Sequence, residues 1–189
     1  KPIDHWRINL GIQRLFDTPY NPYRTYFDKM LQTGYRLAFW GTDAVGISVR
    51  RDVDYSALKF GFYQLYENDV QEDDDVLLGE FQYQKTLTSL WKAGGSLYYI
   101  RDRSNGEGGV SIYAQGLNSK LNGYNGTFRF DFGSDPYAAD IAWIGGYFSR
   151  NEDFMMDRFR LTGFFNYNLG KADVKKGGNW ERGADIGGL

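Results

Sequence analysis

Charged and aromatic side chains recur on the polar side of segments that alternate apolar and polar residues. Successive side chains of an extended strand point to opposite faces, so these residues share one polar face. Where such a face lines a wet passage, Arg and Lys attract anions and acidic sugars, and aromatic rings offer platforms for sugar rings. The candidate solute contacts are Arg36, Trp40, Lys59, Tyr63, Arg129, Asp131, Asp140, Arg158 and Arg160.

The same residues have a second interpretation. Opposite charges on neighbouring strands can pair with each other and hold the sheet in shape, without contacting any solute. The sequence does not give the strand register, so it leaves both interpretations open.

Other kinds of chemistry lack the residues they need. The 189 residues include no cysteine and one histidine, His5, which excludes thiolate metal sites and thiol nucleophiles and leaves zinc sites short of ligands. Asp4 adjoins His5 but points to the opposite face of a strand, so the two are badly placed as a catalytic dyad. The acidic segment 68–75 lacks the spacing of a calcium loop. We expect no enzymatic activity, no cofactor and no metal.

The overall charge also excludes one class of partner. A net charge of −2 gives no general basic surface, so nucleic-acid binding is not expected. Aromatic residues make up 18% of the chain, yet its mean hydropathy is −0.54. Alternation of aromatic and polar residues explains both values, whereas disordered chains are poor in aromatic residues.

This alternation predicts an all-β fold. Trp6, Ile8, Leu10 and Ile12, for example, are interleaved with polar residues and glycine. About ten strands are predicted, at 6–13, 35–40, 44–50, 58–63, 77–88, 90–101, 108–117, 127–132, 139–149 and 158–169. Turn residues separate them at 41–43, 51–54, 67–75, 102–109, 118–126, 133–136 and 151–153. Such connections join neighbouring antiparallel strands in an up-and-down meander, and residues 1–189 form a single domain.

One segment departs from the alternation. Tyr23, Tyr26, Phe27, Met30 and Leu31 follow helical spacing after Pro22, and the segment ends at Gly34. A short amphipathic helix at 23–32 is expected there, with an extended connection as the alternative.

Two architectures show this alternation: a soluble barrel or sandwich with its apolar face inward, and a transmembrane barrel with its apolar face toward lipid. Several segments reach the nine to eleven residues, roughly, that cross a bilayer at a tilt. Tyr and Trp also gather near segment ends, as at a membrane boundary, namely at Trp40, Tyr66, Tyr98, Tyr99, Tyr147 and Tyr167. These features favour all or part of a transmembrane β-barrel.

The strands 128–133 (Phe-Arg-Phe-Asp-Phe-Gly) and 159–170 (Phe-Arg-Leu-Thr-Gly-Phe-Phe-Asn-Tyr-Asn-Leu-Gly) carry a resemblance. In texture, over most of its length, the chain resembles bacterial outer-membrane β-barrel proteins, among them the large porin-like barrels of the alginate-export type. No diagnostic motif accompanies it, so no functional residue is transferred. Such barrels usually end in a strand closed by an aromatic residue. This chain ends at Leu189, which suggests a section of a larger barrel.

The resemblance and the alternation together give the expected function. The expectation is a passive channel, or porin, of the bacterial outer membrane for small anionic or carbohydrate solutes, with membrane lipid and envelope proteins as partners. A soluble β-barrel or sandwich that binds a sugar or an apolar ligand is the first alternative. A non-conducting barrel that scaffolds an envelope complex is the second.

Overall fold

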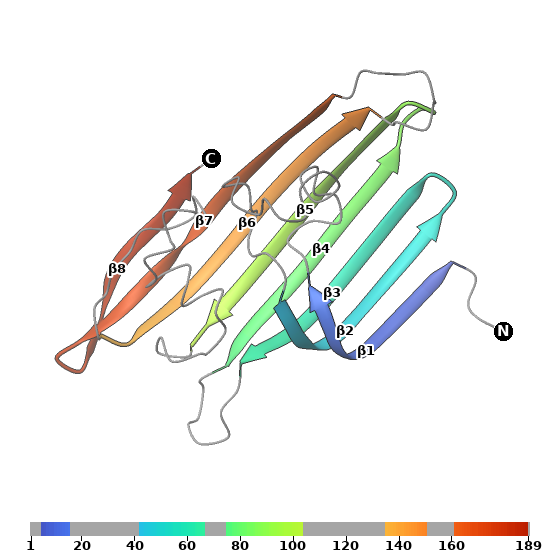
Figure 1. The fold of residues 1–189 in the computed structure, drawn as a ribbon. Coiled ribbons are helices and arrows are strands. Elements are labelled where there is room, and N and C mark those ends of the chain that lie inside the picture. The colour runs from blue at the N-terminus through green and yellow to red at the C-terminus, as the bar shows by residue number, and fades with distance from the viewer. Residues whose placement is uncertain (1–4, 16–41, 67–74, 104–134, 151–160, 189) are drawn as a thin grey trace.

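The fold is one antiparallel sheet of eight strands (Figure 1). The computed structural model describes residues 5–15, 42–66, 75–103, 135–150 and 161–188. The strands are β1 (Trp6–Leu15), β2 (Thr42–Val53), β3 (Ser56–Tyr66), β4 (Val76–Thr86), β5 (Trp91–Asp102), β6 (Tyr137–Arg150), β7 (Thr162–Lys176) and β8 (Asn179–Gly188). Each strand pairs with those that precede and follow it in sequence, so the predicted up-and-down meander is confirmed.

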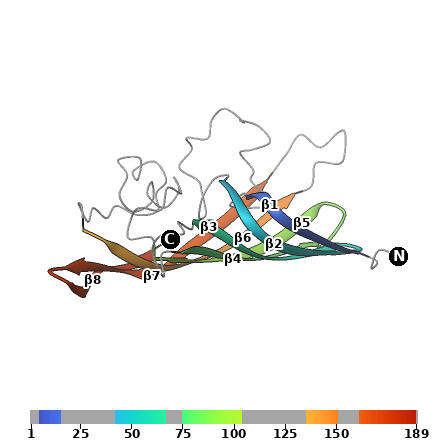
Figure 2. The same cartoon turned by 90° about the horizontal axis from the view of Figure 1, so that it is seen from below.

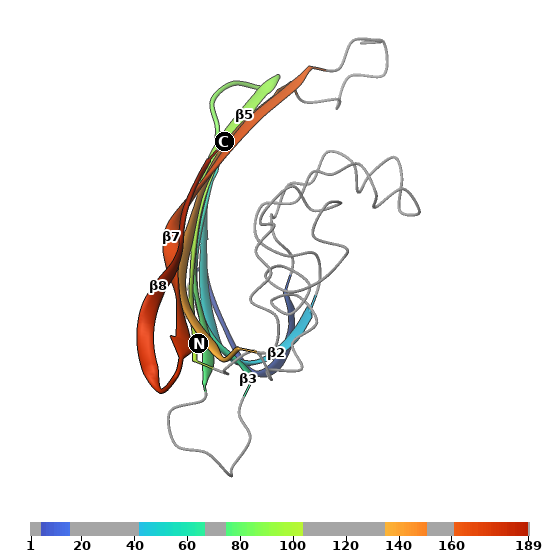
Figure 3. The same ribbon diagram turned by 90° about the vertical axis from the view of Figure 1, so that its left-hand side faces the viewer.

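The sheet is curved and open. Seen edge-on, it forms an arc with a concave and a convex side (Figure 3), and seen from below it is a single thin layer (Figure 2); β1 and β8 are its two outermost strands (Figure 1). Of the predicted strands, 35–40, 108–117 and 127–132 lie outside the described residues, as does the expected helix at 23–32. That the sheet closes into a transmembrane barrel stays a prediction.

Several strands, β2 among them, are longer than the alternation predicted. The expected turn at 41–43 is wrong, because β2 begins at Thr42, which pairs with Leu15. The expected loop at 51–54 is also too long, because β2 continues to Val53 and only Asp54 and Tyr55 connect it to β3. Asp54 has a φ of 44°, and the Ser56 hydroxyl donates to the Val53 carbonyl at 3.1 Å. Hydrogen bonding within the ladder therefore extends through residues whose types favour turns.

One strand was not predicted. β8 pairs with β7 beyond a two-residue turn, Gly177–Gly178, in which both residues have positive φ, 56° and 91°. Positive φ at both central positions defines the hairpin turn that Gly-Gly favours. The turn signal was present in the sequence, but β8 carries few apolar residues to complete a pattern.

The two ends of the sheet differ in their connections. The β2–β3 and β4–β5 connections share one end and are short: Asp54–Tyr55 and Leu87–Leu90. In the second, the Thr88 hydroxyl accepts from the Trp91 amide at 3.2 Å. The β6–β7 connection, 151–161, lies at the same end. The β1–β2, β3–β4 and β5–β6 connections share the other end with the Gly177–Gly178 turn, and two of them, 16–41 and 103–136, are the longest connections of the sheet. We call these the turn end and the loop end.

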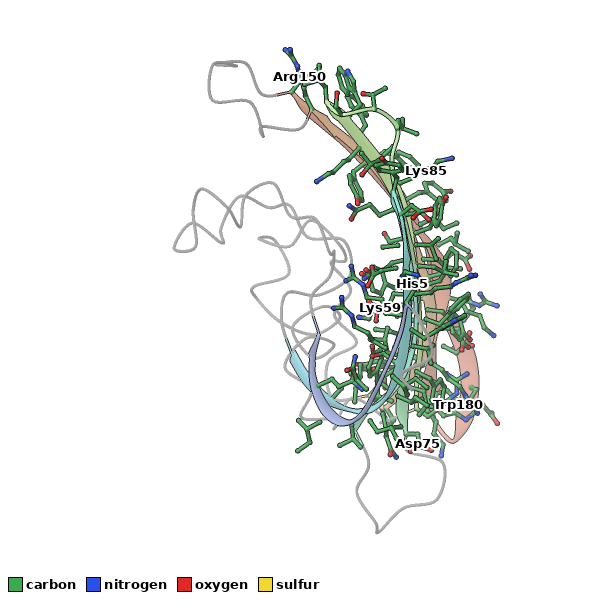
Figure 4. The ribbon with its side chains drawn as sticks, turned by 90° about the vertical axis from the view of Figure 1, so that its right-hand side faces the viewer. His5, Lys59, Asp75, Lys85, Arg150 and Trp180 are labelled. Atoms are coloured by element: carbon green, nitrogen blue, oxygen red, sulfur yellow. The ribbon has the colours of Figure 1, made fainter. Side chains whose placement is uncertain are left out.

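The register, which is regular except for one shift each in the β3–β4 and β7–β8 pairings, assigns the described side chains to the concave or the convex face. Figure 4 shows Lys59 on the concave side and Lys85 on the convex side. Lys59, Gln82, Ser96 and Gly145 form one concave row across β3 to β6. Phe60, Phe81, Leu97 and Ile144 form the adjacent convex row. The convex row is apolar, whereas the concave face is polar at its centre and also carries buried apolar side chains toward the loop end, among them Leu78, Ile100 and Ile141.

Glycines face aromatic rings directly across the ladder. The pairs are Gly46 with Tyr63, Gly94 with Tyr147, Gly146 with Phe165 and Gly163 with Phe148. A Cβ at Gly94 would lie 2.7 Å from the Tyr147 ring, so only glycine leaves the ring its space. An aromatic ring over a strand glycine restores the contacts that the missing side chain would make.

This packing gives a test with a matched control one residue away. We expect Gly94→Ala to lower the free energy of unfolding by about 1–3 kcal/mol, because its Cβ collides with the Tyr147 ring. Gly95→Ala places its Cβ 3.4 Å from the Gly145 carbonyl oxygen and should be neutral or slightly stabilising. Equilibrium urea unfolding followed by circular dichroism measures both, and equal effects would contradict the packing argument.

Candidate functional site

The centre of the concave face is a polar network around Glu80. The Glu80 carboxylate is buried on β4, where it accepts from the Tyr63 hydroxyl at 2.8 Å and lies 2.7 Å from the Lys59 ammonium. The Gln82 side-chain amide donates both to Glu80 and to the Tyr98 hydroxyl. Three strands, β3 to β5, thus contribute to one hydrogen-bonded cluster.

A second polar group lies on the concave face of β1 and β2. The Asn9 amide donates to the Ser48 hydroxyl at 3.2 Å, and that hydroxyl donates to Gln13 at 2.6 Å. Toward the turn end, the Arg50 guanidinium lies 2.8 Å from the Asp52 carboxylate. Polar contacts therefore continue from β1 to β5, and most concave charges there have a partner of opposite sign.

Of the three candidate residues within the described part of the chain, two lie on the predicted polar face. Lys59 points to the concave side, but its charge is balanced by Glu80. Tyr63 shares this face, yet its ring is fully buried and its hydroxyl is held by Glu80, so it offers no open platform for a sugar. Lys59 thus pairs with an opposite charge on the neighbouring strand, which is the second interpretation of these residues.

A third candidate lies on the other face. The prediction that Asp140 belongs to the polar face with Lys59 is wrong, because the register puts it in the convex row of Arg101 and Lys171. Its carboxylate accepts from the Tyr99 hydroxyl and from Arg103, each at 2.8 Å. The error has a physical reason: β6 carries apolar residues on both faces, including buried Ile141 and exposed Ile144.

The remaining candidates, Arg36, Trp40, Arg129, Asp131, Arg158 and Arg160, lie outside the described residues. Sequence reasoning also missed the central group of the network. Glu80, Gln82 and Gln84 alternate with Phe81 and Tyr83, a signal that would have placed all three polar side chains on the lysine face.

The convex face is apolar and exposed. Large side chains on it include Leu10, which is 75% exposed, and Ile8, Ile12, Phe60, Phe62, Ile144, Phe165 and Leu169. Charges occur only toward its ends: Arg51, Lys85 and Arg150 border the turn end, and Arg101, Asp140 and Lys171 border the loop end as one row paired directly across β5 to β7. On the described parts of β2 to β7, no charged residue occupies a convex position between these two borders.

Aromatic residues accompany the turn-end border. Trp6 lies beneath Arg51, with 5.3 Å from the guanidinium carbon to the ring centroid. Trp91 packs against Phe148 beside Arg150, with ring centroids 6.2 Å apart. Tyr83 precedes Lys85 on β4. This border therefore combines cations with amphipathic rings.

Within the described residues, no helix is long and apolar enough to span a bilayer, and no three acidic or histidine side chains gather as metal ligands.

The Glu80 network predicts a loss of stability when its central carboxylate is removed. Glu80→Ala leaves Lys59 and the Tyr63 hydroxyl without their acceptor, which should cost about 2–3 kcal/mol in urea unfolding. Glu181→Ala, at an exposed position on β8, is the control and should change stability by less than about 0.5 kcal/mol. Adding Lys59→Met to Glu80→Ala should recover part of the loss, because the unpaired charge is gone. Equal losses for Glu80→Ala and Glu181→Ala would show that the network does not stabilise the sheet.

In comparisons with known proteins, no protein-family model, no curated protein and no solved structure matches the chain.

Proposed function

We propose that the sheet is part of the wall of a bacterial outer-membrane β-barrel, with its convex face toward lipid and its concave face toward a wet lumen. The barrel acts as a passive channel for small anionic or carbohydrate solutes. The proposal rests on the exposed apolar side chains of the convex face and, above all, on the slope of the charged border at the turn end.

The polarity supports lipid outside and water inside. In a water-soluble sheet, the face turned away from the interior is polar, and large apolar side chains cluster on the covered face. Here, the apolar side chains of Ile47, Phe60 and Phe62 are exposed on the convex face. The concave face buries the polar Glu80 and Gln82 together with apolar side chains such as Leu78, Ile100 and Ile141. Transmembrane barrels likewise present an apolar band outward, and the polar centre of the concave face matches their polar interior.

The border at the turn end carries the proposal because it slopes across the sheet. A row drawn straight across the ladder from Arg51 passes through Tyr83 on β4 and Gly146 on β6. The cations stand two residues further along β4, at Lys85, and four residues further along β6, at Arg150. From β2 to β6, the border therefore moves toward the turn end by one residue with each strand.

This slope has the magnitude that a tilted barrel strand requires. With a rise of about 3.3 Å per residue and a strand spacing of about 4.8 Å, one residue per strand corresponds to a slope of roughly 35°. Strands of membrane barrels tilt by about 35–45° from the barrel axis. Once the strands are tilted by this angle, Arg51, Lys85 and Arg150 lie at one level, as on a membrane boundary. The loop-end row of Arg101, Asp140 and Lys171 runs straight across β5 to β7 and does not share this slope.

The width of the apolar band agrees with a bilayer. On β6, Asp140 and Arg150 are ten residues apart, which is about 33 Å along the strand and about 27 Å along the membrane normal at this tilt. The apolar band of outer-membrane barrels is about 25 Å tall. Because such barrels have short periplasmic turns and longer external loops, the turn end is assigned to the periplasmic side.

Lumen charge supports the solute preference. Arg50 and Lys59 are balanced by carboxylates, but Arg7 is largely exposed and reaches only Asp52, at 3.6 Å, which Arg50 already holds. Lys92 also occupies a concave position, opposite Thr86. Cations in excess over their partners along a wet passage favour anionic solutes.

The lipid-facing assignment is tested by arginine at two positions of equal exposure. Ile144 and Leu161 are each 42% exposed, but Ile144 lies within the apolar band and Leu161 beside Arg150 at the border. In lipid vesicles, Ile144→Arg should cost about 2–4 kcal/mol of unfolding free energy and Leu161→Arg at most about 1 kcal/mol, because the penalty falls toward the interface. Unfolding in urea, followed by tryptophan fluorescence, measures the difference.

A water-soluble fold would give another result. On a sheet exposed to water, both arginine variants would change stability by less than about 0.5 kcal/mol. The chain would then fold as a monomer without detergent, as expected of the soluble binding module.

The channel is tested by ion preference in a planar bilayer. A salt gradient across the reconstituted full chain should give a reversal potential of the sign expected for anions. Arg7→Glu combined with Lys92→Glu should move it toward cation preference, because the unbalanced lumen charge is inverted. Lys85→Glu, on the convex face, is the matched control and should leave the potential unchanged. A folded, inserted and electrically silent protein would instead favour the non-conducting scaffold.

A further inference from the structure

The convex face contains an apolar groove over β4. Its volume is about 370 Å³, and its apolar lining includes Ile47, Phe60, Phe62, Phe81, Leu97 and Tyr99. The floor is Gly79, which pairs with Phe62 on one side and Tyr99 on the other. A Cβ at Gly79 would meet only the Tyr99 carbonyl oxygen, at 3.8 Å, so the space above this glycine is open. Unlike Gly94, Gly79 is not covered by the ring of a cross-strand partner.

A cation stands at the loop-end rim of this groove. Arg101 is the next convex residue beyond Tyr99 on β5, and it is exposed. The nearby carboxylate of Asp140 is held by Tyr99 and Arg103. Among the described residues, Arg101 forms no ion pair of its own. An exposed guanidinium therefore adjoins an open apolar groove at the charged border.

We propose that this groove binds a phosphate-bearing anionic lipid, with one acyl chain over Gly79 and the phosphate against Arg101. This inference rests on the proposed membrane location and adds to it a specific lipid site. The apolar lining provides no partner for a polar occupant, whereas the cation at the rim complements a negative headgroup. Gly79 admits the chain between Phe62 and Tyr99, which would otherwise be separated by a side chain.

The site is tested with a local fluorescent label, which the absence of native cysteine makes possible. Leu97→Cys, labelled with bimane, reports on the groove. Ile8→Cys reports on the same convex row four strands away, outside the groove. The labelled full chain is reconstituted in phosphatidylcholine vesicles that contain increasing fractions of brominated phosphatidylglycerol, whose bromine atoms quench nearby bimane.

We expect the groove label to select the anionic lipid about fivefold over its mole fraction, as one interfacial cation would provide. The Ile8 label should be quenched in proportion to the mole fraction. Arg101→Gln and Gly79→Leu, one removing the cation and the other filling the groove, should each abolish the selection. Lys85→Gln, at the opposite border, is the matched control and should preserve it.

Three outcomes would overturn the proposal. Proportional quenching at both labels in the otherwise unchanged chain would show that the groove has no preference. Displacement of the brominated lipid by added inorganic phosphate would show that the occupant is a free anion, not a lipid. Failure of brominated phosphatidylcholine to quench either label would overturn the membrane location itself, and with it this site.

Discussion

The register of the antiparallel ladder is the constraint on which the rest of the structure depends. Seven successive pairings run from β1 to β8, and only the β3–β4 and β7–β8 pairings contain a shift. Because side chains alternate with period two, a slip of one residue would exchange the faces of every strand beyond it. It would turn Glu80 toward the apolar surface and Phe81 toward the polar network. Both faces, the sloped border and the groove follow from this single alignment.

Two kinds of contact hold that alignment in place. Rings over glycines, as with Tyr147 over Gly94, fit in only one register, since any other residue would collide with the ring. The hydrogen bonds of Glu80 to Tyr63 and Gln82 likewise join side chains from neighbouring positions of one face. Shape and polarity therefore select the same pairing, so local and global preferences agree.

The sequence predicted the class of fold well and the site only in part. Strict alternation, as from Trp6 to Ile12, was enough to predict strands and the faces of Lys59 and Tyr63. It failed in β6, where Ile141 and Ile144 are apolar on opposite faces, and so Asp140 was placed on the wrong one. It also missed β8, whose short hairpin turn was visible but whose residues lack an apolar stripe. Neither the Glu80 network nor the sloped border can be derived without the register, because both are relations between strands.

The order of the strands has a consequence for how such a chain can change its length. Among the eight strands that the structure describes, none crosses over another, and each forms its backbone ladder only with its sequence neighbours. A hairpin such as β7–β8 therefore adds to the sheet without rearranging the ladder that precedes it. A hairpin consists of two antiparallel strands, so it begins and ends at the same end of the sheet. Adding or removing a whole hairpin therefore leaves the direction of every other strand unchanged. A lineage of such proteins can therefore lengthen or shorten by duplication or loss of one modular unit, while the older strands keep their partners.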